Sequence, residues 1–172
     1  MEENGYLHAL FDTAGDWKII YSNYQCDKCI VEYRAQMVQT DSGIADLSVL
    51  LLSDTSGPTF IMARYLEHTT DCLQAWEHTG SGWNKVGELT VDDAWLDVNK
   101  WYKISAKFDA SSKSFEYTQC DESGNCYTLS GTWTIDLTNT YVGFRYHEGE
   151  HYVDWIRVRK RADQEPTVSL IL

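Results

Sequence analysis

Apolar and polar residues alternate with a period of two along most of this chain. The alternation is clearest in residues 30–40 and in residues 101–109. A period of two is typical of β-strands that bury one face. Residues 47–52 are apolar on both sides, as expected for a strand that is covered twice. The residues expected to face the core in the clearest strands are Val31, Tyr33, Ala35, Met37, Leu73, Ala75, Tyr102, Ile104, Ala106 and Phe108.

Short strands of this kind recur along the chain, with turn signals about every 8 to 12 residues. No segment has the period of an amphipathic helix, although the acidic residues 91–99 leave room for one helical turn. The pattern predicts an all-β domain of two stacked antiparallel sheets, a β-sandwich. An up-and-down barrel of about eight strands is the alternative, and the strand that is apolar on both sides favours the sandwich. The expected strands are 6–12, 17–24, 30–40, 47–52, 59–67, 72–78, 83–89, 101–109, 114–119, 127–130, 140–147 and 151–160.

The last two expected strands flank a short connection at residues 148–150 that contains a glycine. Two alternating segments around such a turn predict an antiparallel hairpin. In its second strand Asp154, Ile156 and Val158 share one side. We therefore expect Asp154 to lie on the core side, where a lone carboxylate is costly.

Length and composition indicate one globular domain without a membrane span. A chain of 172 residues can bury a substantial core, and 43% hydrophobic with 23% charged residues excludes a disordered chain. No apolar run approaches the roughly 20 residues that cross a bilayer. The net charge of −12 argues against a nucleic acid partner, because phosphates require a basic surface.

Five cysteines leave at least one thiol unpaired within the chain. Cys120 and Cys126 flank a turn between two expected strands, so a disulfide across that hairpin is sterically reasonable. Cys26 and Cys29 have the spacing of half a zinc site, and only Cys72 remains to complete it. A Cys26–Cys29 disulfide or two free thiols is therefore favoured over a metal. The cysteine usage indicates an oxidising, extracellular or cell-surface setting.

Several strand motifs resemble those of a known family. They are the strand 32–36 (EYRAQ), residues 47–54 (LSVLLLSD), residues 101–104 (WYKI), residues 141–144 (YVGF), residues 153–159 (VDWIRVR) and the segment 165–169 (EPTVS). Together they resemble the concanavalin A-like (laminin-G-like) jelly rolls, and most closely the DUF2341 family of archaeal and bacterial surface proteins. The resemblance implies a jelly-roll β-sandwich over residues 1–161, with residues 162–172 as a tail or linker.

The resemblance implies a carbohydrate-binding or adhesive module of a secreted or cell-surface protein, with a glycan or polysaccharide as partner. Relatives mostly use the concave face of one curved sheet, so the outward residues of the strands are the candidates. An indole ring can stack on the apolar face of a sugar, while Arg, Gln and His bind hydroxyls or carboxylates. The expected ligand-binding residues are Arg34, Gln36, Arg64, Gln74, Trp76, Arg145 and His147. The simpler interpretation is that these are the solvated sides of strands.

Enzymes occur on the same fold, so a polysaccharide lyase or glycoside hydrolase is an alternative function. A glycosidase needs two carboxylates about 5 to 10 Å apart, and the related hydrolases carry them close together on one strand. No such motif occurs here, and no catalytic residue is assigned. A structural module of an envelope or virion is the third class.

A structural calcium ion is the cofactor that the resemblance suggests. Asp154 matches a calcium ligand of some related sandwiches, with oxygens near Asp12 as further ligands. Calcium takes about six to eight oxygens, some of which loop carbonyls could supply. The other interpretation is that Asp154 only accepts hydrogen bonds from its surroundings.

Overall fold

The computed structural model describes residues 2–3, 6–10, 17–39, 45–53, 59–67, 70–79, 82–92, 95–147 and 150–161. The described residues form thirteen strands. No helix among these residues is long and apolar enough to cross a membrane. Residues 162–172, expected as a tail, lie outside the described part. The strands are β1 (Glu2–Glu3), β2 (Tyr6–Leu10), β3 (Trp17–Gln25), β4 (Lys28–Gln39), β5 (Ala45–Leu52), β6 (Thr59–Glu67), β7 (Cys72–Thr79), β8 (Trp83–Thr90), β9 (Trp101–Asp109), β10 (Ser114–Asp121), β11 (Cys126–Thr132), β12 (Tyr141–His147) and β13 (Glu150–Lys160).

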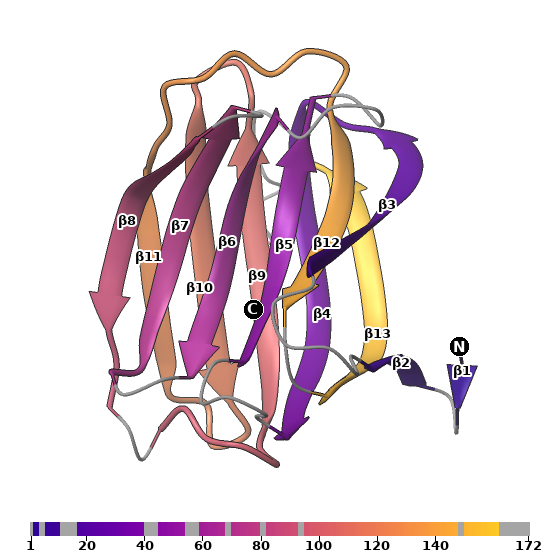
Figure 1. The fold of residues 1–172 in the computed structure, drawn as a ribbon, viewed down its shortest axis with the longest axis vertical. Coiled ribbons are helices and arrows are strands. Elements are labelled where there is room, and N and C mark those ends of the chain that lie inside the picture. The colour runs from indigo at the N-terminus through magenta and orange to yellow at the C-terminus, as the bar shows by residue number, and fades with distance from the viewer. Residues whose placement is uncertain are drawn as a thin grey trace, which may run out of the picture.

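The strands form two antiparallel sheets stacked face to face, as Figure 1 shows. Among the described residues, one sheet has seven strands in the order β1-β2-β13-β4-β9-β10-β11, and the other has six in the order β3-β12-β5-β6-β7-β8. The expected all-β sandwich is confirmed.

The core lies between the sheets and is built by the alternation read from the sequence. From the seven-stranded sheet, β4 and β9 bury the residues on their apolar sides, including Val31 and Phe108. The six-stranded sheet contributes Val49, Leu51 and Ile61 to the core from the side that faces the first sheet. Four tyrosines are also nearly inaccessible there, namely Tyr33, Tyr65, Tyr102 and Tyr117.

The hairpin expected at residues 140–160 is wrong. β12 pairs with β3 and β5 in the six-stranded sheet, whereas β13 pairs with β2 and β4 in the seven-stranded sheet. The two strands therefore face each other across the core instead of bonding edge to edge. Alternation has the same period in both arrangements, so it cannot distinguish a hairpin from a crossing between sheets.

The face expected for Asp154 is also wrong, because β13 is irregular at this position. Val153 is opposite Ala35 in β4, and the next paired residue, Trp155, is opposite Arg34. Asp154 is the extra residue of this β-bulge, which shifts the side-chain faces by one position. Its carboxylate meets the Arg34 guanidinium on the outer side of the sheet instead of entering the core.

β5 is buried on both faces, as its apolar sequence predicted. Leu50 and Leu52 lie on the side away from the core and form a second apolar cluster with Phe60 and Met62 of β6. The outer face of the six-stranded sheet thus carries a buried apolar cluster. The site described below is built beside it.

Two disulfides are present, Cys26–Cys29 before β4 and Cys120–Cys126 across the β10–β11 turn. Cys72 is a free thiol and is buried. Among the described segments, residues 91–92 and 95–100 form turns without a helix.

Candidate functional site

A row of polar side chains runs across five strands of the six-stranded sheet on its outer face. Strand register places Arg145 of β12 opposite Ser48 of β5, Ser48 opposite Arg64 of β6, and Arg64 opposite Gln74 of β7. Gln74 is in turn opposite Glu88 of β8. Residues directly opposite on one face lie within side-chain reach, so the pairing alone brings this set together.

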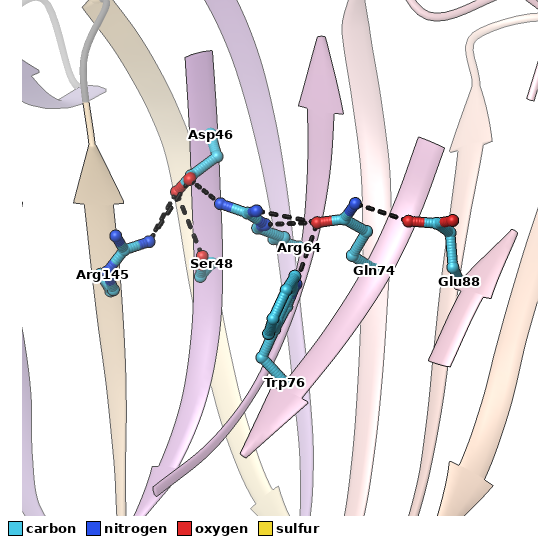
Figure 2. A network of polar contacts seen from close by, with 7 residues as sticks. All are labelled: Asp46, Ser48, Arg64, Gln74, Trp76, Glu88 and Arg145. Atoms are coloured by element: carbon cyan, nitrogen blue, oxygen red, sulfur yellow. Dashed lines mark hydrogen bonds and ion pairs between the residues drawn. The ribbon is translucent and has the colours of Figure 1, made fainter. Parts of the chain in front are cut away.

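Asp46 joins the two arginines of the row. Its carboxylate accepts hydrogen bonds from Arg64 Nη1, from Arg145 Nη1 at 3.2 and 3.3 Å, and from Ser48 Oγ at 3.2 Å (Figure 2). Asp46 and Ser48 are fully buried, and Arg145 is 6% exposed. Two guanidinium groups therefore share one carboxylate in a desolvated setting.

Gln74 connects this ion cluster to the aromatic residues. Its Oε1 accepts from Arg64 Nε and Nη2 at 3.2 and 2.8 Å and from Trp76 Nε1 at 2.9 Å. Its Nε2 donates to Glu88 Oε2 at 2.8 Å (Figure 2). The amide orientation is thus fixed by donors on one end and an acceptor on the other.

Aromatic rings flank the row on β6, β7 and β8. Trp76 and Trp83 meet edge to face with centroids 6.4 Å apart, and His78 lies 4.5 Å from Trp83. The Arg145 guanidinium lies 5.4 Å above the Trp83 ring. Trp83 is 43% exposed, so a large part of this indole faces solvent.

A cavity of about 280 Å³ opens where the arginines meet the indoles. We call it the arginine pocket; its lining residues are Met62, Arg64, Trp76, Trp83 and Arg145. Its volume is at the lower end of the range for small-molecule sites, about 300 to 1,000 Å³. It fits a single ring-sized group of a ligand.

The electrostatics of the arginine pocket are cationic. The two arginines and Asp46 leave one excess positive charge. Burial lowers the pKa of Arg145; the Asp46 carboxylate opposes this and the charge of Arg64 adds to it. Both guanidinium groups stay protonated at neutral pH, since arginine does not lose its proton in proteins. The local sign is thus opposite to the net charge of −12.

The structure places the expected binding residues on both sheets. Arg64, Gln74, Trp76 and Arg145 come together in this row, as Figure 2 shows. All of them except Gln74 also line the arginine pocket. The backbone of His147 ends β12 in the same sheet, but its side chain is outside the described part.

Arg34 and Gln36 belong to β4 of the other sheet, so they cannot share a face with Trp76. Gln36 donates to the carbonyl of Asn99 at 2.7 Å.

Arg34 also forms an ion pair with Asp154. Its guanidinium binds the Asp154 carboxylate at 3.0 Å and Glu122 at 2.6 Å, and it lies 4.3 Å above the Trp101 ring. The cationic partner that the structure gives Asp154 is therefore Arg34, through the oxygen Oδ2. Asp12, the other expected ligand, is outside the described residues. Within those residues no group of three or more His, Cys, Asp or Glu side chains is placed to hold a metal ion. The calcium site expected at Asp154 and Asp12 therefore stays a prediction.

Sequence reasoning missed several residues of the site, among them Asp46, Glu88 and Trp83. Asp46 and Ser48 do share one side of β5, but the apolar run that follows hid this signal. Trp83 also lies on the outward side of β8, as its pairing with His78 shows. Only the pairing of the strands shows that Asp46 and Trp83 lie near Arg64 and Arg145.

The carboxylates in the row are both engaged by neighbouring cations. Asp46 binds two arginines, and Glu88 binds Lys85 at 2.7 Å. The hydrogen bonds from Lys85 and Gln74 lower the pKa of Glu88 below its ordinary value. A general acid must instead hold its proton near neutral pH, which the lowered pKa of Glu88 does not favour.

Comparison with known proteins shows the fold. Neither a family model nor a curated protein matches the sequence. Among solved structures, the carbohydrate-binding module CBM66 of Bacillus subtilis superimposes with a TM-score of 0.66 at 11% identity, over 87% of this chain and 84% of that one. The exoplasmic/lumenal domain of VIP36, in its Ca²⁺/Man₃GlcNAc-bound form, gives 0.73 at 11% identity, over 95% and 82%.

The GH43 protein BlXynB of Bacillus licheniformis, as a mutant, matches with a TM-score of 0.68 at 11% identity. The match covers 94% of this chain but only 34% of that protein, so the chain spans about a third of its length. At such identities the likeness lies in the fold. This chain therefore has the concanavalin A-like jelly-roll fold of lectins and carbohydrate-binding modules.

Proposed function

We propose that this domain is a carbohydrate-binding module and that the arginine pocket holds a sugar unit of its glycan. The observation that carries the proposal is the pairing of two preorganised arginines with two indole rings around one ring-sized cavity. A pyranose offers an apolar C–H face to an indole and directional oxygens to guanidinium groups. The carbohydrate-binding module CBM66 and the Man₃GlcNAc-bound VIP36 domain among its structural neighbours support the same class of function.

We propose an acidic glycan as the ligand, one whose sugar carries a carboxylate. Two arginines against one aspartate leave a positive charge that attracts an anion, and a guanidinium can hold a carboxylate with charge-assisted hydrogen bonds. The pocket lies on a protein of net charge −12, so the attraction is local and selects the face on which the glycan binds.

The setting we propose is extracellular, either secreted or on a cell surface. The two disulfides support it, because disulfides persist mainly in oxidising compartments. The motifs quoted above support a kinship with the DUF2341 surface proteins, which we propose on that ground alone. Calcium is not part of the proposed function, because the described contacts of Asp154 are with Arg34.

A glycan array with neutral and carboxylate-bearing polysaccharides tests this function. We expect binding to acidic glycans, weakened by added salt because dissolved ions screen the attraction between the pocket and the anionic glycan as it approaches from the solvent. If no acidic glycan binds, the proposal is wrong. Incubation of each bound glycan with the protein, followed by a reducing-sugar assay, separates a binding module from an enzyme. Release of reducing ends would favour the enzymatic alternative.

A further inference from the structure

A second, larger cavity of about 880 Å³ lies at one end of the seven-stranded sheet. We call it the end cavity. Its lining consists of residues 92, 95 and 99–101, which lie after β8 and at the start of β9, and of residues 121–123 and 125–127 around the β10–β11 turn. Register brings these parts together, because Asp121 at the end of β10 is opposite Tyr102 at the start of β9. Both ends lie at the bottom of the view in Figure 1. The end cavity shares no lining residue with the arginine pocket.

Three aromatic rings in the wall of the end cavity are held in place by their neighbours. Trp95 lies 4.5 Å from Tyr127, edge to face. The Tyr102 hydroxyl donates to the Trp95 carbonyl at 2.6 Å and so fixes the segment that carries this indole. Trp101 is covered by the guanidinium of Arg34 at 4.3 Å, and Arg34 does not line the cavity. The rings are therefore preorganised, which reduces the entropy lost when a ligand binds.

One polar atom of this wall is buried and has no partner in the described part of the chain. Trp95 is 8% exposed, and its indole N–H finds no acceptor among the described residues. Indole nitrogen only donates, and buried donors in folded proteins are nearly always bonded. This donor lies in a residue of the cavity wall, so its NMR signal is a sensitive reporter of changes there.

The turn that forms the opposite wall is rigid and offers acceptors. Asn125 donates its backbone N–H and its Nδ2 to the Asp121 carboxylate at 2.8 and 3.0 Å. Gly124 adopts a φ of 88°, a left-handed conformation that favours glycine, and the Cys120–Cys126 disulfide closes the base of the turn. The hydrogen bonds from Asn125 lower the pKa of Asp121, so this carboxylate stays ionised and accepts hydrogen bonds.

The charge of the end cavity is opposite to that of the arginine pocket. Its lining includes Asp92, Asp121 and Glu122 but only one cation, Lys100. An acidic sugar would be repelled here. Hydroxyl groups, by contrast, donate well to carboxylates, and the apolar face of a sugar ring packs well on indole and phenol rings.

We infer that the end cavity is a second ligand site and that it binds a neutral saccharide. It lies on different residues from the arginine pocket and does not depend on the function proposed for that pocket. With both sites occupied, the domain would hold two different sugar chemistries, or two parts of one mixed polysaccharide. Occupying two linked sites raises the overall affinity through the effective concentration of the second one.

Nuclear magnetic resonance of the indole N–H groups tests this inference on the intact domain. The probes are neutral gluco-, manno-, xylo- and galacto-oligosaccharides, with oligogalacturonate as the acidic probe; single Trp→Phe variants assign the signals. We expect a neutral probe to shift the Trp95 and Trp101 signals and leave those of Trp76 and Trp83 in place. At about 10 mM probe, even a site with a Kd of about 1 mM is largely occupied. If no neutral probe then moves Trp95 or Trp101, the inference is overturned.

Substitutions separate this site from the other. Trp101→Ala should weaken binding of the neutral probe about tenfold or more, while Trp101→Phe retains a ring and most of the binding. Trp155→Ala is the matched control, because this exposed indole lines neither cavity. Melting curves show that each variant is folded. Neutral binding that survives Trp101→Ala but is lost in Trp83→Ala would assign it to the arginine pocket and overturn the inference. A failure of the acidic probe to bind, with neutral binding intact, would contradict the function proposed for the arginine pocket and leave this inference standing.

Discussion

Asp46 is the residue on which the arginine pocket depends. It lies buried between Arg64 and Arg145 and neutralises one of their two charges. Removing one partner of a buried ion pair leaves an uncompensated charge, which is much more costly than losing an exposed pair.

We predict that Asp46→Asn lowers the free energy of unfolding by about 3 to 5 kcal/mol, as urea denaturation would measure. The control is Glu88→Gln, which removes a carboxylate from the same row at a site 41% exposed. This control should cost about 1 kcal/mol or less. Equal losses in the two variants would show that Asp46 is not a buried counter-ion.

Glu77 is a second buried carboxylate, on the core side of β7, and it predicts a pH dependence. It accepts from the Thr134 N–H and hydroxyl, both at 2.7 Å, and from Asn84 at 2.8 Å. Burial alone would raise the pKa of Glu77, but these hydrogen bonds outweigh it and the pKa falls below the ordinary value of 4.5. A lowered pKa stabilises the fold above the ordinary value, and this contribution is lost as the pH falls through the lowered one.

In Glu77→Gln this pH-dependent contribution is absent. We expect the variant to be less stable than the wild type at neutral pH, with the difference shrinking between about pH 5 and pH 3. Urea denaturation across that range measures it. A constant difference at every pH would refute the assignment.

At the scale of elements, the packing of β12 between its neighbours constrains its sequence at Gly143. Gly143 lies between β3 and β5, and a Cβ there would be 2.8 Å from Leu52 Cδ2 and 2.9 Å from the carbonyl oxygen of Ile20. Neither distance is compatible with a normal contact. Since the Ile20 atom belongs to the backbone, a side chain could be accommodated only by moving β3.

Gly143→Ala should therefore destabilise the domain by about 1 to 3 kcal/mol through overpacking. Gly82→Ala serves as its control, because a Cβ at Gly82 meets nothing within 4 Å. Thermal melting of the two variants beside wild type gives the comparison. A wild-type melting temperature for Gly143→Ala would mean that β3 yields at no cost.

The faces of the strands could be predicted from the sequence, but their partners could not. The apolar sides of β4 and β9 are buried as expected, because a period of two depends only on neighbours within the strand. Sheet membership depends on contacts between distant segments, so the same pattern led to a hairpin for two strands that lie in different sheets. The bulge at Asp154 likewise leaves no mark in a period-two pattern.

The candidate site was predictable only in part for the same reason. Arg64, Gln74, Trp76 and Arg145 could be identified as outward residues of their strands. The register that joins them to Asp46, and that separates them from Arg34, is a property of the assembled sheets.

At the scale of the whole molecule, the domain presents two cavities of opposite charge on a strongly acidic protein. At Asp154 the structure shows the Arg34 guanidinium as the cationic partner. We predict that the wild type melts at the same temperature in calcium and in chelator. A ligand that binds only the native state raises stability by mass action, so a calcium-dependent rise in melting temperature would contradict this.

The central claim is that the arginine pocket binds an acidic glycan, and isothermal titration of one pair of variants tests it most directly. Trp83, 43% exposed, lines the arginine pocket, whereas Trp155, 42% exposed, lines neither cavity. Against the acidic glycan that binds best on the array, Trp83→Ala should weaken binding by about 1 to 3 kcal/mol, or roughly 5- to 150-fold in Kd. Trp155→Ala should bind like the wild type. Equal affinities for Trp83→Ala and wild type would contradict the claim.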